Sequence, residues 1–232
     1  AHPEFFKISN HRERFHWRWD TPEKYQLNMR AYFRMLSGVD HVMARVLQTL
    51  KEEGLAENTI VVYVADNGYY MGDRGFAGKW SHHEQSQRVP LVIFDPRQPK
   101  QHRGRTVDTM ALNLDLPATF LDWAGVPVPA SYQGASLKPM IEGEATPETW
   151  REDFFCEHFN PRYAMSWEGV RGQRFKYACY LDQNPAYEFL HDLKDDPDEL
   201  INLATNPEYA AQLKLMRQRT DALAEGYVNA LD

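Results

Sequence analysis

Cysteine is nearly absent from this chain of 232 residues, which contains only Cys156 and Cys179. Two cysteines exclude a disulfide framework and a cysteine-rich zinc site. One bridge stays possible if the two lie on neighbouring strands, but we expect two free, buried thiols. The sequence also lacks an apolar run approaching the roughly 20 residues that a membrane-spanning helix needs. We therefore expect no membrane partner.

A run of basic residues is also missing, and the formal net charge is -7. Because surfaces that bind nucleic acids are strongly basic, we expect no nucleic-acid partner, although a local basic pocket stays possible. Aromatic residues, in contrast, make up 13% of the chain, a share found in carbohydrate-handling proteins and, more often, in ordinary cores. With 43% hydrophobic residues, the chain can bury a sizeable core, as one large domain or one and a half.

The first 21 residues predict a long loop, because they are polar and aromatic without a period. A helix follows, with Thr21 as its N-cap and Pro22 at its first position, and Gly54 ends it. Its apolar residues recur at spacings of three and four, which predicts one apolar stripe along the helix. The stripe consists of Tyr25, Met29, Tyr32, Phe33, Leu36, Val39, Met43, Val46, Leu47 and Leu50.

A nearly continuous β-branched segment, Ile60–Ala65, predicts a strand buried on both faces. The order of helix, short turn and buried strand is typical of a layered α/β sheet. Further along the chain, Val89–Phe94 predicts another strand and Leu112–Ala124 another helix. The segment Pro129–Pro147 is rich in turn residues and predicts a connector.

The pattern changes after residue 147, where short apolar segments alternate with turn residues. The predicted elements are the strands Phe154–Phe159, Gly169–Val170, Phe175–Leu181 and Tyr187–Leu190, and a helix from Pro207 to Leu223. We therefore expect residues 148–232 to form a small α+β subdomain, with a short antiparallel sheet and one helix. Residues 1–147 are expected to belong to a larger α/β domain.

The loop after the Ile60–Ala65 strand is the candidate site, because chemistry in open α/β sheets gathers at the carboxyl ends of strands. It begins with Asp66, Asn67 and Gly68. Carboxylate and amide oxygens suit Ca²⁺ or Mg²⁺, and the glycine lets both side chains face one point. The competing interpretation, an ordinary turn, is the more common one for these three residues taken alone.

The residues downstream favour the functional interpretation. Glycines at 68, 72, 75 and 78 describe a loop that can fold closely around a ligand. Lys79 offers a compact positive charge for an anionic ester oxygen, although a solvated surface lysine would have the same sequence. His83 is a proton donor or an oxyanion ligand, or simply a half-buried loop histidine. His82 is expected to be its exposed neighbour.

The sequence resembles the C-terminal half of type I, formylglycine-dependent, sulfatases over nearly its whole length. The ordered motifs that carry the resemblance are Val61–Gly68, Gly72–Gly75, Gly78–Trp80, Glu84, Arg88–Leu91, Asn113–Asp122, Gln133–Leu137, Gly169–Arg171, Arg174–Tyr177, His191–Leu193, Asp195–Glu199 and Asn202–Leu203. The resemblance implies an alkaline-phosphatase-like layered sheet with helices on both faces, followed by the α+β subdomain. It also implies hydrolysis of sulfate esters, with a sulfated carbohydrate or small molecule as substrate, and a periplasmic or secreted location.

The resemblance also assigns roles to single residues. Asp66 and Asn67 are similar to two ligands of the active-site Ca²⁺, with Mg²⁺ the less favoured ion. Lys79 is similar to the lysine that contacts the sulfate oxygens. His83 and His158 resemble positions that line the substrate pocket in carbohydrate-active members. Arg74 stands where relatives often carry a histidine.

One essential motif of the family is missing. The formylglycine nucleophile arises from Cys or Ser in a Cys/Ser-x-Pro-x-Arg motif, and no cysteine or serine here begins one. We therefore expect no catalytic nucleophile in this chain, and formylglycine in a missing N-terminal half that acts as its partner. Two alternatives stay open. One is a phosphodiesterase or phosphonate hydrolase of the same superfamily, in which a histidine usually stands where Asn67 does. The other is a non-catalytic remnant that binds sulfated glycans.

Overall fold

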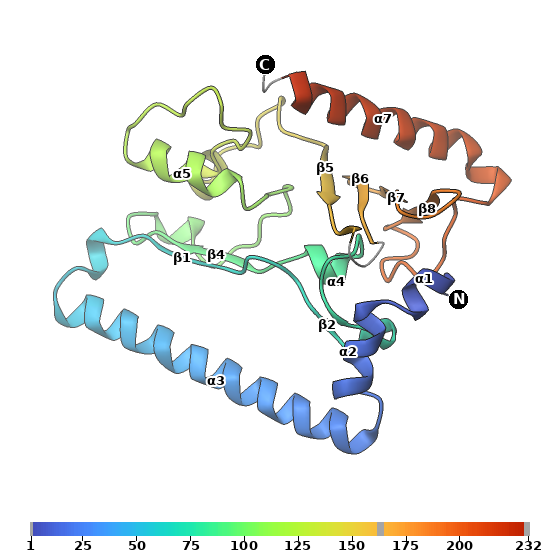
Figure 1. Ribbon diagram of the computed structural model, residues 1–232. Coiled ribbons are helices and arrows are strands. Elements are labelled where there is room, and N and C mark those ends of the chain that lie inside the picture. Colours follow the sequence, from blue (N-terminus) through green and yellow to red (C-terminus); the bar gives the residue numbers. More distant parts are fainter. Residues whose placement is uncertain (1, 162–164, 230–232) are drawn as a thin grey trace. The chain divides into compact units, whose positions relative to one another are not determined.

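A computed structural model describes residues 2–161 and 165–229 (Figure 1). The chain forms two compact units that are each assembled from separate segments. The first unit contains Ala1–Tyr25, Asn67–Arg88 and Arg151–Asp232, and the second contains Gln26–Asp66 and Val89–Trp150. Segments distant in sequence thus share one core in each unit. The expected domain boundary between residues 147 and 148 stays a prediction for the complete protein.

The first unit is built on a four-stranded antiparallel sheet in the order β5-β6-β7-β8. Its strands are β5 (Asp153–His158), β6 (Trp167–Gly172), β7 (Phe175–Tyr180) and β8 (Tyr187–Asp192). All four strands predicted after residue 147 are therefore confirmed. The second of these strands, β6, is longer than the predicted Gly169–Val170. Residues on both sides of that pair also form ladder pairs with β5 and β7.

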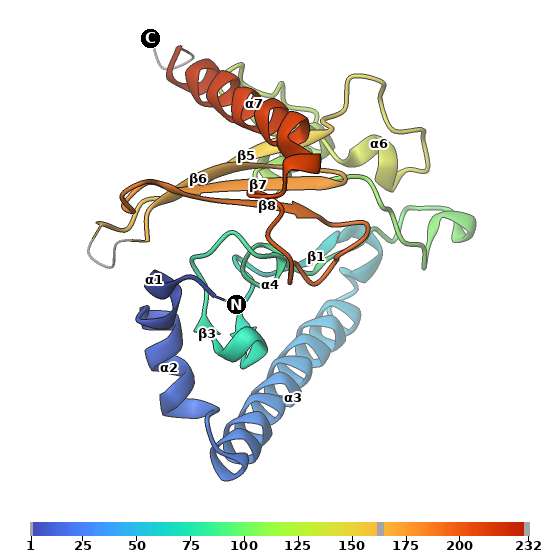
Figure 2. The same ribbon diagram turned by 90° about the vertical axis from the view of Figure 1, so that its right-hand side faces the viewer.

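Each face of this sheet has its own core, since side chains alternate across a strand. On one face lies the long helix α7 (Ala210–Asn229), which continues from η5 (Pro207–Tyr209) and packs against Val170, Tyr177 and Leu190. On the other face lies α1 (Glu4–Lys7), together with the segment that follows residue 67 (Figure 2). The predicted C-terminal helix and the small α+β architecture are confirmed.

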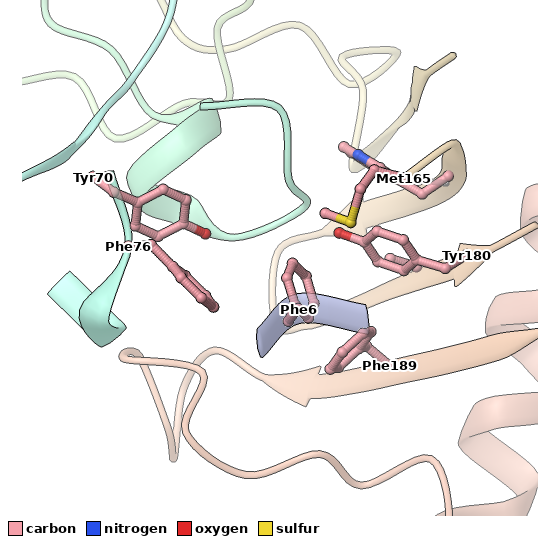
Figure 3. Packing of buried hydrophobic residues seen from close by; sticks show 8 residues of the cluster. Phe6, Tyr70, Phe76, Met165, Tyr180 and Phe189 are labelled. Atoms are coloured by element: carbon pink, nitrogen blue, oxygen red, sulfur yellow. The ribbon is translucent and has the colours of Figure 1, made fainter. Parts of the chain in front are cut away.

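The core on the second face centres on Phe6, whose side chain is fully buried. Its ring lies 5.5 Å from that of Phe76, 5.3 Å from Tyr180 and 5.8 Å from Phe189, measured between centroids (Figure 3). The prediction of a long loop over residues 1–21 is wrong. α1 and α2 (Asn10–Arg18) form there, and Ser9 caps α2 by accepting a hydrogen bond from the Arg12 amide. The helices carry no regular apolar stripe, because aromatic and histidine side chains make up their buried side.

In the second unit, α3 (Pro22–Glu52) confirms the predicted long helix. It is followed by η1 (Ala56–Asn58) and then by β1 (Val61–Val64), which pairs antiparallel with β4 (Leu91–Phe94). The remaining elements of this unit are η3 (Lys100–His102), α5 (Asp115–Trp123) and the short helix α6 (Lys138–Ile141), which lies within the expected connector.

β1 and β4 bury only one of their two faces. The covered face packs against a cluster formed by Leu116 of α5, Met140 of α6 and Leu137, which precedes α6. The strand residues on this face are Val62, Leu91 and Ile93. Val92 and Phe94, on the opposite face, are 59% and 46% exposed. The expectation of a strand buried on both faces is therefore wrong for this chain, because the sheet has two strands and one covered side.

The apolar residues of α3 are also uncovered. None of its residues is buried. Its exposed large apolar side chains are Tyr25, Leu27, Phe33, Met35, Leu36, Val39, Val42, Val46 and Leu47. Among the described helices, none is both long and apolar enough to span a membrane. The two cysteines are free, as expected, but only partly buried.

Candidate functional site

The candidate metal ligands stand at the junction of the two units along the chain. Asp66 is the last residue of its segment in the second unit, and its side chain is exposed. Asn67 is the first residue of the loop segment in the first unit and is half-buried. The surroundings of Asp66 are therefore described within the second unit, and those of Asn67 within the first.

Asn67 and Lys79, twelve residues apart, are brought together by the loop. Lys79 Nζ donates a hydrogen bond to Asn67 Oδ1, and Asn67 Nδ2 donates to the Gly68 carbonyl at 2.8 Å. Gly68 N donates to the Ser86 carbonyl at 2.9 Å. A Cβ at Gly68 would lie 2.2 Å from the Gln85 carbonyl oxygen, so only glycine allows this approach. The predicted amide ligand and the predicted sulfate-binding lysine thus share one polar contact.

Lys79 follows a small hairpin, in which β2 (Tyr70–Met71) pairs with β3 (Ala77–Gly78) around η2 (Asp73–Gly75). Its backbone is fixed on both sides. The Lys79 carbonyl contacts His11 Nε2, and the next residue, Trp80, has a φ of 87°. This left-handed backbone conformation is strained for a residue other than glycine, and such strain is common at functional sites. Trp80 N donates to Ser86 Oγ at 2.9 Å, and the Trp80 carbonyl accepts from Trp167 Nε1 at 2.9 Å.

The predicted pocket residue His83 is 2% exposed and lies in the aromatic interior of the first unit. Its Nδ1 atom is 2.6 Å from the Tyr70 hydroxyl and 3.2 Å from Ser81 Oγ. The expectation that His82 is exposed is wrong, since its exposed fraction is 0%. The loop packs against the sheet, and both rings are buried there. In a strand, neighbouring side chains would instead point to opposite sides. A substrate contact by His83 stays a prediction.

His82, His83 and His191 form a compact group in which one nitrogen atom from each ring lies within 4.8 Å of the others. Such a spacing could hold a metal ion, but hydrogen bonds between neutral rings already account for it. His191 Nδ1 donates to the Ile201 carbonyl at 3.0 Å, which leaves Nε2 as an acceptor. His82 Nε2 is 3.1 Å from that atom, and His82 Nδ1 is 3.0 Å from the Tyr180 hydroxyl. The pattern assigns a protonated His82 Nε2 and a donating tyrosine.

Burial makes these histidines sensitive to acid. Desolvation lowers the pKa of His191 to about 4 and holds the pKa values of His82 and His83 well below the ordinary value of 6.5. The unfolded chain therefore binds protons first as the pH falls below 6.5. We expect each such histidine to lower the free energy of unfolding by about 1.4 kcal/mol per pH unit, until its pKa in the folded state is reached.

Urea unfolding at pH 6.5, 5.5 and 4.5 measures this dependence. The substitution His191→Gln should reduce the slope against pH by about 1.4 kcal/mol per unit, since one titrating group is gone. Val170→Ala is the matched control: Val170 is buried in the core against α7, away from the three histidines, and its truncation should lower stability equally at every pH. An unchanged slope in the histidine variant would contradict the assignment of a neutral buried ring.

His158, the second predicted pocket residue, ends β5 and is half-buried. Burial lowers its pKa, and its Nε2 atom has no hydrogen-bond partner among the described residues. Nδ1 of His11 is another buried atom without a hydrogen-bond partner in the described ranges 2–161 and 165–229. Sequence reasoning missed His11, because it lies in the segment predicted as a loop. The Ser9 cap was the signal that could have revealed the helix.

Two family models match the sequence. One, described as "Sulfatase", matches residues 4–126, and the other, described as "N-sulphoglucosamine sulphohydrolase, C-terminal", matches residues 72–226. The chain belongs to the sulfatase family. A relative of this sulfatase chain, the N-acetylglucosamine-6-O-sulfatase of Bacteroides thetaiotaomicron, is 36% identical over 212 residues, which are 88% of this chain and 37% of the relative.

Solved structures are similar as well. A protein in complex with D-glucosamine-2-N,6-O-disulfate, described as its substrate, matches with a TM-score of 0.82 and 35% identity, over 89% of this chain and 42% of that one. The phosphonate monoester hydrolase of Agrobacterium radiobacter has a TM-score of 0.78 and 31% identity, over 89% and 43%. The chain thus spans about two fifths of these proteins. The likeness confirms the α/β class with helices and small antiparallel sheets.

Proposed function

We propose that the complete protein is a sulfuric ester hydrolase that acts on a sulfated carbohydrate. The contact between the Lys79 ammonium and the Asn67 side-chain oxygen carries the proposal. A sulfate ester bound beside Lys79 would also lie next to a hard oxygen ligand of a cation. Two positive charges on one transferring group are the arrangement that stabilises charge as it develops during hydrolysis.

The residues fit a Ca²⁺ ion by the chemistry of their donor atoms. Asp66 offers a carboxylate and Asn67 an amide oxygen, and Ca²⁺ accepts such oxygen ligands in flexible geometry. Mg²⁺ demands a more regular shell and is less favoured. In the complete enzyme the ion would polarise the sulfate group and formylglycine would supply the nucleophile. The role left to this chain is to orient the ester through Lys79 and to hold the ion through Asp66 and Asn67.

A further part of the enzyme is proposed as the partner of this chain, corresponding to the portion of its relatives that the chain does not match. The second unit supports this proposal, because α3 has an apolar stripe without one buried residue. The uncovered face of β1 and β4 offers further apolar surface, including Val92 and Phe94. Contiguous exposed apolar surface of this kind is typical of an interface. A periplasmic or secreted location stays a prediction.

For the substrate, the relatives suggest an O-sulfated amino sugar. The likeness to an N-acetylglucosamine-6-O-sulfatase supports 6-O-sulfated N-acetylglucosamine as the first compound to assay. The likeness to a phosphonate monoester hydrolase supports phosphonate monoester hydrolysis as the second candidate activity. Asn67 argues against it, since that branch of the superfamily usually has histidine there.

The test is an assay of the complete enzyme on sulfated monosaccharides, an aryl sulfate and a phosphonate monoester under the same conditions. We expect release of sulfate with the highest kcat/KM on a sulfated sugar. A higher kcat/KM on the phosphonate would replace the proposal by the second candidate. No hydrolysis of any ester would favour the remnant that only binds sulfated glycans.

The 232-residue chain by itself should show no sulfatase turnover, because none of its cysteines or serines begins the formylglycine motif. A purified product of verified mass, assayed on an aryl sulfate and on sulfated N-acetylglucosamine, measures this. The complete enzyme in the same assay is the control. Turnover by the isolated chain would mean that it carries a nucleophile of another kind.

A further inference from the structure

A buried ion network lies beneath the Lys79 loop, and its centre is Lys176. This residue is on β7 and has an exposed fraction of 0%. Its Nζ atom lies 2.6 Å from Glu199 Oε1 and 2.7 Å from Glu84 Oε1, and it donates to the His82 carbonyl at 2.9 Å. The ammonium group thus has three oxygen neighbours, of which the His82 carbonyl accepts a hydrogen bond and the two carboxylates form ion pairs.

The carboxylates of the network have further partners. The Glu84 amide donates to Glu199 Oε2 at 2.8 Å, and Arg171 pairs with Glu84 Oε2 at 3.3 Å. Arg74 donates to the Glu199 carbonyl at 2.9 Å. Five segments therefore meet in one set of charges: the hairpin, the short helix that begins at Glu84, β6, β7 and the loop after β8.

Stability alone is a poor explanation for such a network. The free energy lost when charged groups leave water offsets much of the attraction between them. Apolar residues of similar volume often stabilise the folded state equally well or better. β7 illustrates the contrast, because Ala178 and Tyr180 on the same face as Lys176 belong to the apolar core. What an ion network adds is a fixed direction for each hydrogen bond. The loop is the element that such directions would fix.

Two of the three oxygen partners of Lys176 connect to the candidate site. His82 and Glu84 stand three and five residues after Lys79, and Glu84 begins the short helix α4 (Glu84–Gln87). In α4, the Ser86 side chain accepts from the Trp80 amide, and its carbonyl accepts from Gly68, next to Asn67. Lys176 is thus linked to α4 by its ion pair with Glu84, and α4 is linked by hydrogen bonds to Trp80 and Gly68, the residues next to Lys79 and Asn67.

We propose that Lys176 is a positioning residue, which fixes the segment Lys79–Ser86 and thereby holds the Lys79 ammonium against Asn67 where a sulfate ester binds. The inference rests on the proposed function for its effect on catalysis. Its structural part, an ordered loop, does not depend on that function.

The experiment uses the complete enzyme with the paired substitution Lys176→Met and Glu199→Gln. Lys176→Met alone would leave two carboxylates without their central cation and risks a protein that fails to fold. The pair removes one charge of each sign, and Glu84 keeps Arg171 as its partner. The expected result is a Tm within a few degrees of the wild-type value, with kcat/KM on the sulfated substrate lowered roughly 10- to 100-fold, as for misplaced catalytic groups.

A double-mutant cycle with Lys79→Ala separates positioning from general damage. If Lys176 acts through Lys79, the paired substitution should change kcat/KM by less than about threefold in the Lys79→Ala background, since coupled residues are not additive. Equal losses in both backgrounds would overturn the inference. The matched control is Arg219→Met with Asp153→Asn, an ion pair of 2.7 Å between α7 and β5 that should leave kcat/KM unchanged.

Hydrogen exchange keeps the inference testable if the proposed function fails. Amides of residues 79–88 should exchange at least tenfold faster in the Lys176→Met, Glu199→Gln variant, and those of residues 210–225 should not. Unchanged protection in the loop would overturn the positioning role. A wild-type enzyme without sulfatase activity, or one that Lys79→Ala does not affect, would instead overturn the proposed function.

Discussion

Replacing Asp66 by alanine should abolish the metal-dependent hydrolysis of sulfate esters by the complete enzyme. The carboxylate is the one charged ligand that this chain is proposed to offer to Ca²⁺, and the neutral amide of Asn67 cannot compensate for its charge. Hard cations bind mainly through such carboxylates. The measurement is sulfate release after removal of metal by a chelator, followed by titration with Ca²⁺.

Two controls sharpen this test. Asp108→Ala removes an exposed carboxylate from a loop of the same unit and should leave activity and Ca²⁺ dependence unchanged. Asp66→Asn keeps an oxygen ligand without its charge, so activity should return in part at high Ca²⁺ concentration. Full activity of the alanine variant at ordinary Ca²⁺ would show that Asp66 is not a ligand.

Replacing Lys79 by alanine should lower kcat by about 10²- to 10³-fold, the size of the effect when one preorganised donor to a developing negative charge is removed. The half-buried ammonium is held by Asn67, and its backbone is held by His11, so little reorganisation is needed when an ester binds. Loss in kcat rather than in KM alone indicates an interaction that strengthens in the transition state.

Lys194→Ala is the matched control, because this lysine is exposed in the same unit and makes no proposed contact with substrate. Steady-state kinetics of both variants on one sulfated sugar decide the matter. Equal kinetic constants for the Lys79→Ala variant and the wild-type enzyme would remove Lys79 from the site. They would also remove the basis for the contact with Asn67 as the centre of the proposed function.

Much of the fold could be predicted because it follows local periodicity. The apolar spacing of three and four located α3 to within a few residues, and alternating segments located the strands β5 to β8. The helices α1 and α2 could not be predicted in this way. Their buried side chains, such as Phe6 and His11, contact residues that are 60 or more positions away in the chain.

For the site, only those features could be predicted that follow from the chemical nature of its residues. The type and order of Asp66, Asn67 and Lys79 pointed to a cation and an anion, and the structure brings the last two into contact. Lys176 gave no signal, because a lysine within a strand is ordinarily solvated and its partner His82 lies 94 residues away. Burial of His82 and His83 likewise depends on a sheet that forms much later in the sequence.

This dependence constrains the order in which the protein can mature. Translation proceeds from the N-terminus, and domains generally fold as their residues emerge from the ribosome. The segment Asn67–Arg88, however, shares its core with Arg151–Asp232, which is made later. The Lys79 loop therefore acquires its native surroundings only after residues 151–232 have been made. A premature stop codon after residue 150 would remove the interior on which the site rests while leaving its predicted ligands in the polypeptide.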